Sequence, residues 1–191
     1  MRNTILGFVL LTSFFFSSCE KENFYDGDHF FVKNAGAEMP VYIKGNIESK
    51  VFILFLHGGP GGNASLSSFL PVAKELEKDY AFAYWDQRAS GLSQGNPDKE
   101  TFTVEQFVED LDLVVDAINL HYNYPKIVFY GISWGGALGS AYLSTGNYQN
   151  KVARFIDIDS GHNLLDGIPK SVVFVKDYAQ KQIDNGVNVD Y

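Results

Sequence analysis

The sequence predicts an α/β fold in which a mostly parallel sheet is flanked by helices. From residue 51 onward, short runs rich in branched and aromatic residues alternate with longer stretches of helical periodicity. That alternation is typical of strands and helices that follow one another along a parallel sheet. The composition is 46% hydrophobic and 15% aromatic, which is typical of a packed domain. A length of 191 residues indicates one domain with a buried core.

The strands are predicted from short apolar runs bounded by turn residues. Residues 51–56 (Val-Phe-Ile-Leu-Phe-Leu) form an unbroken apolar run, which predicts a strand buried on both faces. Before it, residues 30–33 and 39–44 flank the turn residues 34–36 and predict a hairpin. Further strands are expected at residues 80–85, 126–130 and 151–158.

Helices are predicted at about residues 66–78, from Thr103 onward, at about residues 134–145 and at residues 171–183. The clearest of them opens at Thr103, with Gln106 three residues later as in a capping box. Its apolar residues recur on one face, which we expect to pack on the sheet. They are Val104, Phe107, Val108, Leu111, Val114, Val115 and Ile118.

The N-terminus predicts export. Arg2 is the only charge in residues 1–18, and it precedes an apolar run at residues 5–16. A short positive region, a short apolar region and small residues are typical of a secretory signal peptide, here residues 1–18. The run is shorter than the ~20 residues that a membrane-spanning helix needs.

Cys19 is the only cysteine, so no disulfide can form within the chain. It follows Ser17 and Ser18 at a position that resembles a bacterial lipobox, and we expect it to be acylated. The alternative is ordinary signal cleavage nearby. Acyl chains on Cys19 would anchor the protein to a membrane of the bacterial cell envelope, with residues 19–28 as a polar tether.

The charge pattern excludes several classes of partner. The net charge is −8, and Lys and Arg form no run, so a nucleic-acid partner is not expected. The acidic residues are spread along the chain, as on a solvated surface. We expect no metal and no cofactor.

Residues 131–135 (Gly-Ile-Ser-Trp-Gly) match the G-x-S-x-G nucleophile elbow. The motif lies between a predicted strand and a predicted helix, as the elbow requires. Small residues beside Ser133 let strand and helix approach closely, and the helix N-terminus favours developing negative charge. Ser133 is therefore the candidate nucleophile. The alternative is a glycine-rich turn with an incidental serine.

Residues 57–61 (His-Gly-Gly-Pro-Gly) follow an apolar strand, where a glycine-rich loop can point backbone N–H groups at a substrate oxygen. We expect an oxyanion hole formed by Gly59, or else Gly58, together with Trp134, the residue after the nucleophile. No Gly-Lys-Ser/Thr follows the glycines, which excludes a phosphate-binding P-loop.

A third motif, Trp-Asp-Gln-Arg at residues 85–88 with Gly91 and Ser93, lies between the other two. In this order and spacing the three motifs resemble the proline iminopeptidase branch of the serine α/β-hydrolases, over about residues 28–160. One departure is Ala89, where that family usually has glycine.

The resemblance implies an α/β-hydrolase core at residues 29–160 and the start of a helical cap at residues 161–191. It implies hydrolysis of a small peptide, amide or ester by a Ser-Asp-His triad. Iminopeptidases bind the substrate amine through cap glutamates, and no glutamate follows Glu109 here.

The acid and the base are harder to place. The chain order of this fold is Ser, acid, His, and the only histidine after Ser133 is His162. Asp159 and His162 are candidates for a local acid and base, although we expect a polar loop that leads into the cap. A strand at residues 151–158 would leave an open apolar edge. We therefore expect the 191 residues to be a fragment, or a chain that another chain completes.

The leading hypothesis is an iminopeptidase-like serine hydrolase. The alternative is a catalytically inactive surface lipoprotein that uses the same fold to bind a ligand or partner.

Overall fold

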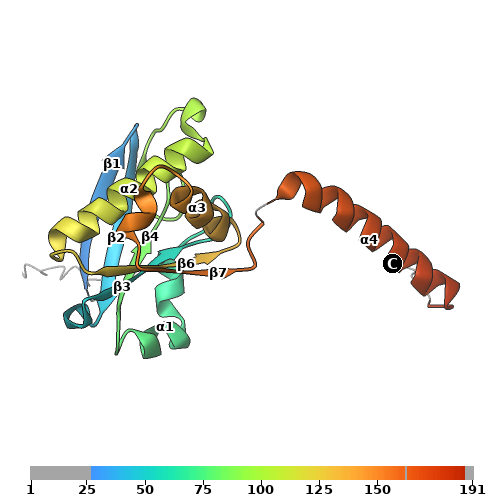
Figure 1. Cartoon of the computed structure of the whole chain (residues 1–191), viewed down its shortest axis with the longest axis horizontal. Helices are drawn as coiled ribbons and strands as arrows, with labels where there is room; N and C mark the ends of the chain where they lie inside the picture. Colours follow the sequence, from blue (N-terminus) through green and yellow to red (C-terminus); the bar gives the residue numbers. More distant parts are fainter. Residues whose placement is uncertain (1–26, 162, 188–191) are drawn as a thin grey trace, which may run out of the picture.

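The computed structural model describes residues 27–161 and 163–187. Within them, one seven-stranded sheet has the order β1-β2-β4-β3-β6-β7, and β5 pairs with β2 (Figure 1). The strands are β1 (Asp28–Asn34), β2 (Ala37–Gly45), β3 (Val51–Leu56), β4 (Ala81–Trp85), β5 (Gln94–Gly95), β6 (Lys126–Ile132) and β7 (Arg154–Ile158). Since β3, β4, β6 and β7 run parallel with helices on both faces, the predicted α/β class is confirmed.

The expected hairpin is formed by β1 and β2, which pair antiparallel from Asp28 opposite Ile43 to Asn34 opposite Ala37. Its two-residue loop has positive φ at both positions, 41° at Ala35 and 80° at Gly36. That backbone matches the twist of the flanking strands, and glycine adopts it without strain.

The parallel register sets which loops meet. Leu56 at the end of β3 pairs with Gly131 of β6, and Ile132 at the end of β6 pairs with Ile158 of β7. The segments that follow these strands therefore leave the sheet at one edge, its carboxyl edge. In an open α/β sheet, that edge is where ligands bind.

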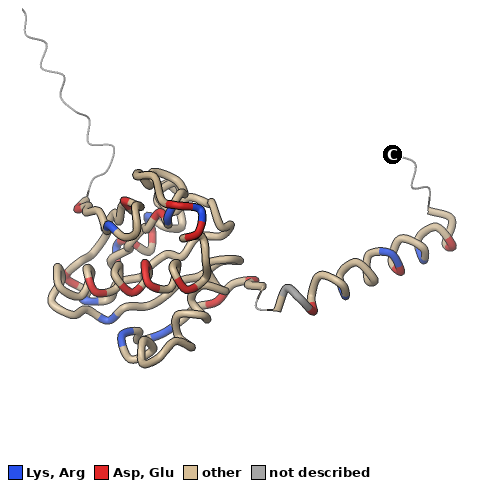
Figure 2. The backbone as a smooth tube through the Cα atoms, turned by 90° about the horizontal axis from the view of Figure 1, so that it is seen from above, with Lys and Arg blue, Asp and Glu red and all other residues tan. Residues whose placement is uncertain are grey.

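Two helices, α2 (Val104–His121) and α3 (Trp134–Leu143), cover one face of the sheet (Figure 1). Thr103 caps α2 by accepting a 3.2 Å hydrogen bond from the Gln106 backbone N–H. The predicted apolar face packs into the main core, except for Val104, which is 45% exposed because it lies in the first turn of the helix. Acidic residues recur along the rest of α2, and Lys and Arg are scattered among several elements (Figure 2).

The other face is covered by the short elements η2 (Ser65–Phe69) and α1 (Pro71–Leu76). One helix was predicted over residues 66–78, and that was wrong. Pro71 has no backbone N–H and forces the preceding residue out of the helical region, so Leu70 is extended at φ −67° and ψ 137°.

Because η2 and α1 are short, part of this face is an open apolar groove of about 530 Å³. Val51, Ile53 and Phe55 of β3 line the groove and are only half buried, whereas Phe52 and Leu54 are buried under α2 and α3. The prediction that β3 is buried on both faces was therefore wrong.

The last two elements also differ from their predicted bounds. Residues 148–151 form a 3-10 turn, so β7 begins only at Arg154, at the edge of the sheet. The final helix, α4 (Leu164–Asp184), begins seven residues before the predicted start, where the Asn163 side chain accepts a hydrogen bond from the Asp166 N–H. It projects away from the sheet (Figure 1). In the described part of the chain, no helix has the length and apolar character to cross a membrane.

Candidate active site

Ser133 lies in a sharp turn between β6 and α3, at the carboxyl edge of the sheet. Its backbone has φ 53° and ψ −117°, a region that costs a non-glycine residue roughly 1–3 kcal/mol. The Ser133 N–H donates a 3.0 Å hydrogen bond to the Ile158 carbonyl, and its own carbonyl accepts from the N–H groups of Gly136 and Ala137. The side chain is exposed. The strained turn thus presents a hydroxyl to solvent.

Glycines around this turn permit a close approach of strand and helix. A Cβ on Gly131 would lie 2.8 Å from the Gly136 nitrogen, and a Cβ on Gly135 would collide with the Leu56 carbonyl. A Cβ on Gly136 would meet Asp157 and Ser160. These contacts are the physical reason for the run of small residues.

The loop after β3 lies against Ser133. A Cβ on Gly58 would be 3.4 Å from the Ser133 Cβ and 3.9 Å from its Oγ. Gly59 has φ 130°, and it precedes Pro60 through a cis peptide bond. Trp134 is the first residue of α3, where a backbone N–H has no acceptor within the helix. The structure therefore brings the proposed oxyanion residues, Gly58, Gly59 and Trp134, to the same edge as Ser133.

His57 is buried (2% exposed) behind this loop. Its Nε2 accepts a 3.1 Å hydrogen bond from the Gln87 N–H, so the ring proton is on Nδ1, which donates to the Gly58 carbonyl at 2.8 Å. Burial lowers the pKa of His57, against the opposing effects of the Gly58 hydrogen bond and the Asp86 charge. Both ring nitrogens are thus hydrogen-bonded to loop backbone atoms, and the imidazole holds these loops together.

Gln87 joins the three motifs, a role that the sequence analysis missed. Its side-chain Nε2 donates to the His57 carbonyl at 3.2 Å, and its Oε1 accepts from the Trp134 indole N–H at 2.9 Å. The sequence signal for this role is that Gln87 belongs to the third motif, which lies between the other two along the chain.

Two buried carboxylates hold the surrounding loops. Asp86 accepts from the N–H groups of Ala64, Ser65 and Leu92, at 2.7, 3.2 and 2.9 Å. Asp110 of α2 accepts from Arg88 Nε at 2.6 Å and from a terminal guanidinium nitrogen at 2.8 Å, and both side chains have no exposed surface. A bidentate pair of this kind fixes geometry as well as charge.

Asp159 follows β7 directly and therefore leaves the sheet at the Ser133 edge, where it is exposed with φ 51°. His162 and Cys19 lie outside the described residues. The described histidines contact other residues. His29 stacks on Tyr42, His121 stacks on Phe30, and His57 bonds to Gly58 and Gln87 as described above. Among the described residues, therefore, the structure brings no imidazole into hydrogen-bond contact with Ser133.

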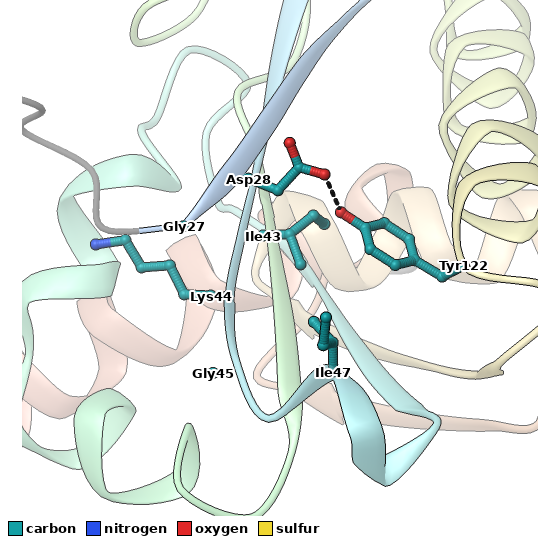
Figure 3. A pocket seen from close by; sticks show the side chains of 7 residues that line it. All are labelled: Gly27, Asp28, Ile43, Lys44, Gly45, Ile47 and Tyr122. Carbon is teal, nitrogen blue, oxygen red and sulfur yellow. Dashed lines mark hydrogen bonds between the residues drawn. The ribbon is translucent and has the colours of Figure 1, made fainter.

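A separate pocket of about 360 Å³ lies at the opposite, amino edge, where Gly45 pairs with the first residue of β4 (Figure 3). The Tyr122 hydroxyl donates a 2.7 Å hydrogen bond to Asp28 there. Burial, and then Asp28, raise the pKa of Tyr122, so the phenol stays protonated. In the described part of the chain, no group of three His, Cys, Asp or Glu residues is placed to hold a metal ion.

The sheet order, the sharp serine turn and the adjoining glycine loop are those of the α/β-hydrolase fold. Residues 51–183 match the family described as the alpha/beta hydrolase fold, and the chain belongs to that family.

Within the family, the chain is similar to proline iminopeptidases. It is 36% identical over 87 residues to a probable aminopeptidase of Bacillus subtilis (strain 168), and 36% identical over 93 residues to a proline iminopeptidase of Heyndrickxia coagulans. Those segments cover 45% and 49% of this chain.

Two solved structures are also similar to the chain. A proline iminopeptidase-related protein from Thermus thermophilus has 26% identity and a TM-score of 0.58, over 70% of this chain and 44% of its own. A putative aryl esterase from Burkholderia cenocepacia has 25% identity and a TM-score of 0.56, over 70% of this chain and 47% of its own. The curated relatives are matched over only 27% and 30% of their lengths.

Proposed function

We propose that this chain carries the nucleophile and oxyanion loop of an iminopeptidase-like serine hydrolase acting on small peptides, amides or esters. The observation that supports it most is the strained backbone of Ser133, at φ 53° and ψ −117°, beside Gly58. Strain of this kind at an exposed serine is typical of an active site. The likeness to proline iminopeptidases supports the peptide and amide substrates.

In the proposed chemistry, the Ser133 Oγ attacks the substrate carbonyl. The developing oxyanion accepts hydrogen bonds from the Trp134 N–H and from the Gly58–Gly59 segment. The positive end of α3 adds to this stabilisation. Removing one donor of such a hole typically lowers kcat about 10²–10³-fold.

The base is not assigned to His57, because both of its ring nitrogens are occupied. Positioned acid–base help contributes roughly 10²–10⁴-fold in rate. Since no described imidazole contacts Ser133, we propose that the 191-residue chain by itself reacts slowly, at the level that an oxyanion hole and substrate binding support. Asp159 and His162 remain the local alternative for acid and base.

A fluorophosphonate probe tests the proposal, because it reacts covalently with activated serines. We expect slow labelling that is lost in Ser133→Ala and kept in Ser140→Ala, a matched change within α3. Equal labelling of wild type and Ser133→Ala would contradict the proposal, and absence of labelling in both would favour an inactive binding protein.

Turnover of a prolyl-arylamide and a p-nitrophenyl ester by the 191-residue chain tests whether the chain contains the catalytic base. The proline iminopeptidase of Heyndrickxia coagulans serves as the positive control. Fast turnover by the 191-residue chain that His162→Ala abolishes would assign the base to His162.

We also propose that the protein is exported to the bacterial cell envelope and lipid-anchored through Cys19. The support is the sequence pattern of residues 1–19, which lies outside the described residues.

A further inference from the structure

We infer that Gln87 is a positioning residue of the proposed site, which sets the distance between the nucleophile turn and the glycine loop. This inference rests on the proposed function, because it assigns Gln87 a task at that same site. It comes from hydrogen bonds that a single buried side chain makes to two separate loops.

On one side, Gln87 holds the glycine loop. Its backbone N–H and its side-chain Nε2 both bond to His57, at 3.1 and 3.2 Å. His57 in turn donates to the Gly58 carbonyl at 2.8 Å. Because the peptide unit is planar, fixing the Gly58 carbonyl also fixes the direction of the Gly59 N–H, which belongs to the same unit.

On the other side, Gln87 holds the nucleophile turn. Its Oε1 accepts from the Trp134 indole at 2.9 Å, and the indole packs edge-on against Phe107 of α2, with ring centroids 5.4 Å apart. Trp134 carries the second proposed oxyanion N–H on its own backbone. One glutamine therefore contacts Trp134 directly and is linked to the Gly58–Gly59 segment through His57.

Gln87 itself has little freedom to move. It is fully buried, and the Ser93 hydroxyl donates a 2.8 Å hydrogen bond to its backbone carbonyl. The flanking residues Asp86 and Arg88 are anchored by the hydrogen bonds described above. A rigidly held amide is suited to setting a donor separation, since an oxyanion hole depends on preorganised geometry.

The first test uses ¹⁵N NMR of the 191-residue chain and so does not depend on activity. The chain has two tryptophans, and Trp134→Phe assigns the indole resonances. In Gln87→Met, which keeps the side-chain length, we expect the Trp134 indole and the Gly58, Gly59 and Trp134 amide resonances to shift. Indole N–H exchange should rise at least about tenfold, as for the loss of one buried hydrogen bond. The matched control is Gln106→Met, which removes a half-buried glutamine of α2 whose side chain bonds only to Glu109 among the described contacts.

The second test distinguishes the hydrogen bond from Gln87 to Trp134 from the hydrogen bond from Gln87 to His57. Gln87→Glu keeps an acceptor for Trp134 but replaces the donor to His57, so the Gly58 amide resonance should shift while exchange of the Trp134 indole N–H stays slow. It also serves if Gln87→Met does not fold.

The third test is a double-mutant cycle on the rate of fluorophosphonate labelling. Trp134→Phe should slow labelling about tenfold and Gln87→Met at least as much, and the double variant should be no slower than Gln87→Met, because Gln87→Met already removes the hydrogen bond to Trp134. Resonances in Gln87→Met that match those of Gln106→Met would overturn the inference, whatever the labelling shows. Absence of labelling in wild type would instead contradict the proposed function, and the NMR result would still decide the role of Gln87.

Discussion

Gly135, in the first turn of α3, lies directly against the backbone carbonyl of Leu56 at the end of β3. The same site faces the His57 carbonyl, which would be 2.8 Å from an added Cβ. Neither carbonyl can yield without moving β3, so the contact fixes how closely the helix that follows Ser133 approaches the strand before the glycine loop.

Gly135→Ala should therefore destabilise the fold by about 3 kcal/mol, at the upper end of overpacking costs. Urea denaturation followed by circular dichroism measures the change. The matched control is Gly167→Ala in α4, where an added Cβ has no heavy atom within 4 Å. The control should lose no stability, because alanine favours a helix over glycine. Equal midpoints for the two variants would contradict the close contact at Gly135.

Ser133→Gly should stabilise the chain by about 1 kcal/mol while it abolishes labelling. Glycine relieves the strain at φ 53°, and the relief exceeds the roughly 0.5–1 kcal/mol that glycine costs in conformational entropy. Ser140→Gly, inside α3, carries the same entropy cost without any strain to relieve and should destabilise. A lower denaturation midpoint for Ser133→Gly than for wild type would show that the turn is not strained.

Arg88→Met should destabilise the fold by about 3–5 kcal/mol, because it leaves the Asp110 carboxylate buried without its ion-pair partner. Lys78→Met breaks an ion pair whose side chains are 66% and 71% exposed, and it should change stability by no more than about 0.5 kcal/mol. The two free energies of unfolding, measured side by side, check the difference. A small loss in Arg88→Met would show that the buried pair does not hold the loop.

Stability should fall as the pH is lowered through the ordinary range of histidine, and His57 should be a cause. Burial holds the folded pKa of His57 below its ordinary value of 6.5, so below pH 6.5 the unfolded chain binds a proton that the folded chain does not. The contribution of neutral His57 to the free energy of unfolding is complete above pH 6.5 and is lost as the pH falls below that value. Unfolding free energies between about pH 7.5 and 5.5 should show a shallower slope in His57→Gln than in His121→Gln, an exposed control. Identical slopes would contradict the neutral, buried imidazole.

Cys19→Ser should block processing or release the protein from membranes, because it removes the thiol to which the anchoring acyl chains are proposed to attach. Incorporation of a labelled fatty acid in cells, followed by fractionation, measures it. Ser18→Ala is a neighbouring control that keeps the thiol. Wild type that takes up no fatty acid would refute the anchor.

Local sequence patterns were enough to predict the α/β class, the hairpin and the position of the serine turn, because each depends on periodicity or on a motif a few residues long. Residues 131–135 predict the turn between β6 and α3 since only small side chains allow it. Pro71 also carries a local signal, and the break before it was predictable from the restriction that proline places on Leu70.

Which side chains meet across the chain depended instead on the tertiary structure. Gln87 is 30 residues from His57 and 47 from Trp134 along the chain. Its hydrogen bonds to these two residues depend on the parallel register that brings three loops to one edge of the sheet. The half-buried face of β3 has the same kind of origin: Val51, Ile53 and Phe55 are as apolar as their neighbours, but their burial depends on the short α1 packed above them. Local sequence sets what each element is, and the register and packing of distant elements set what each side chain touches.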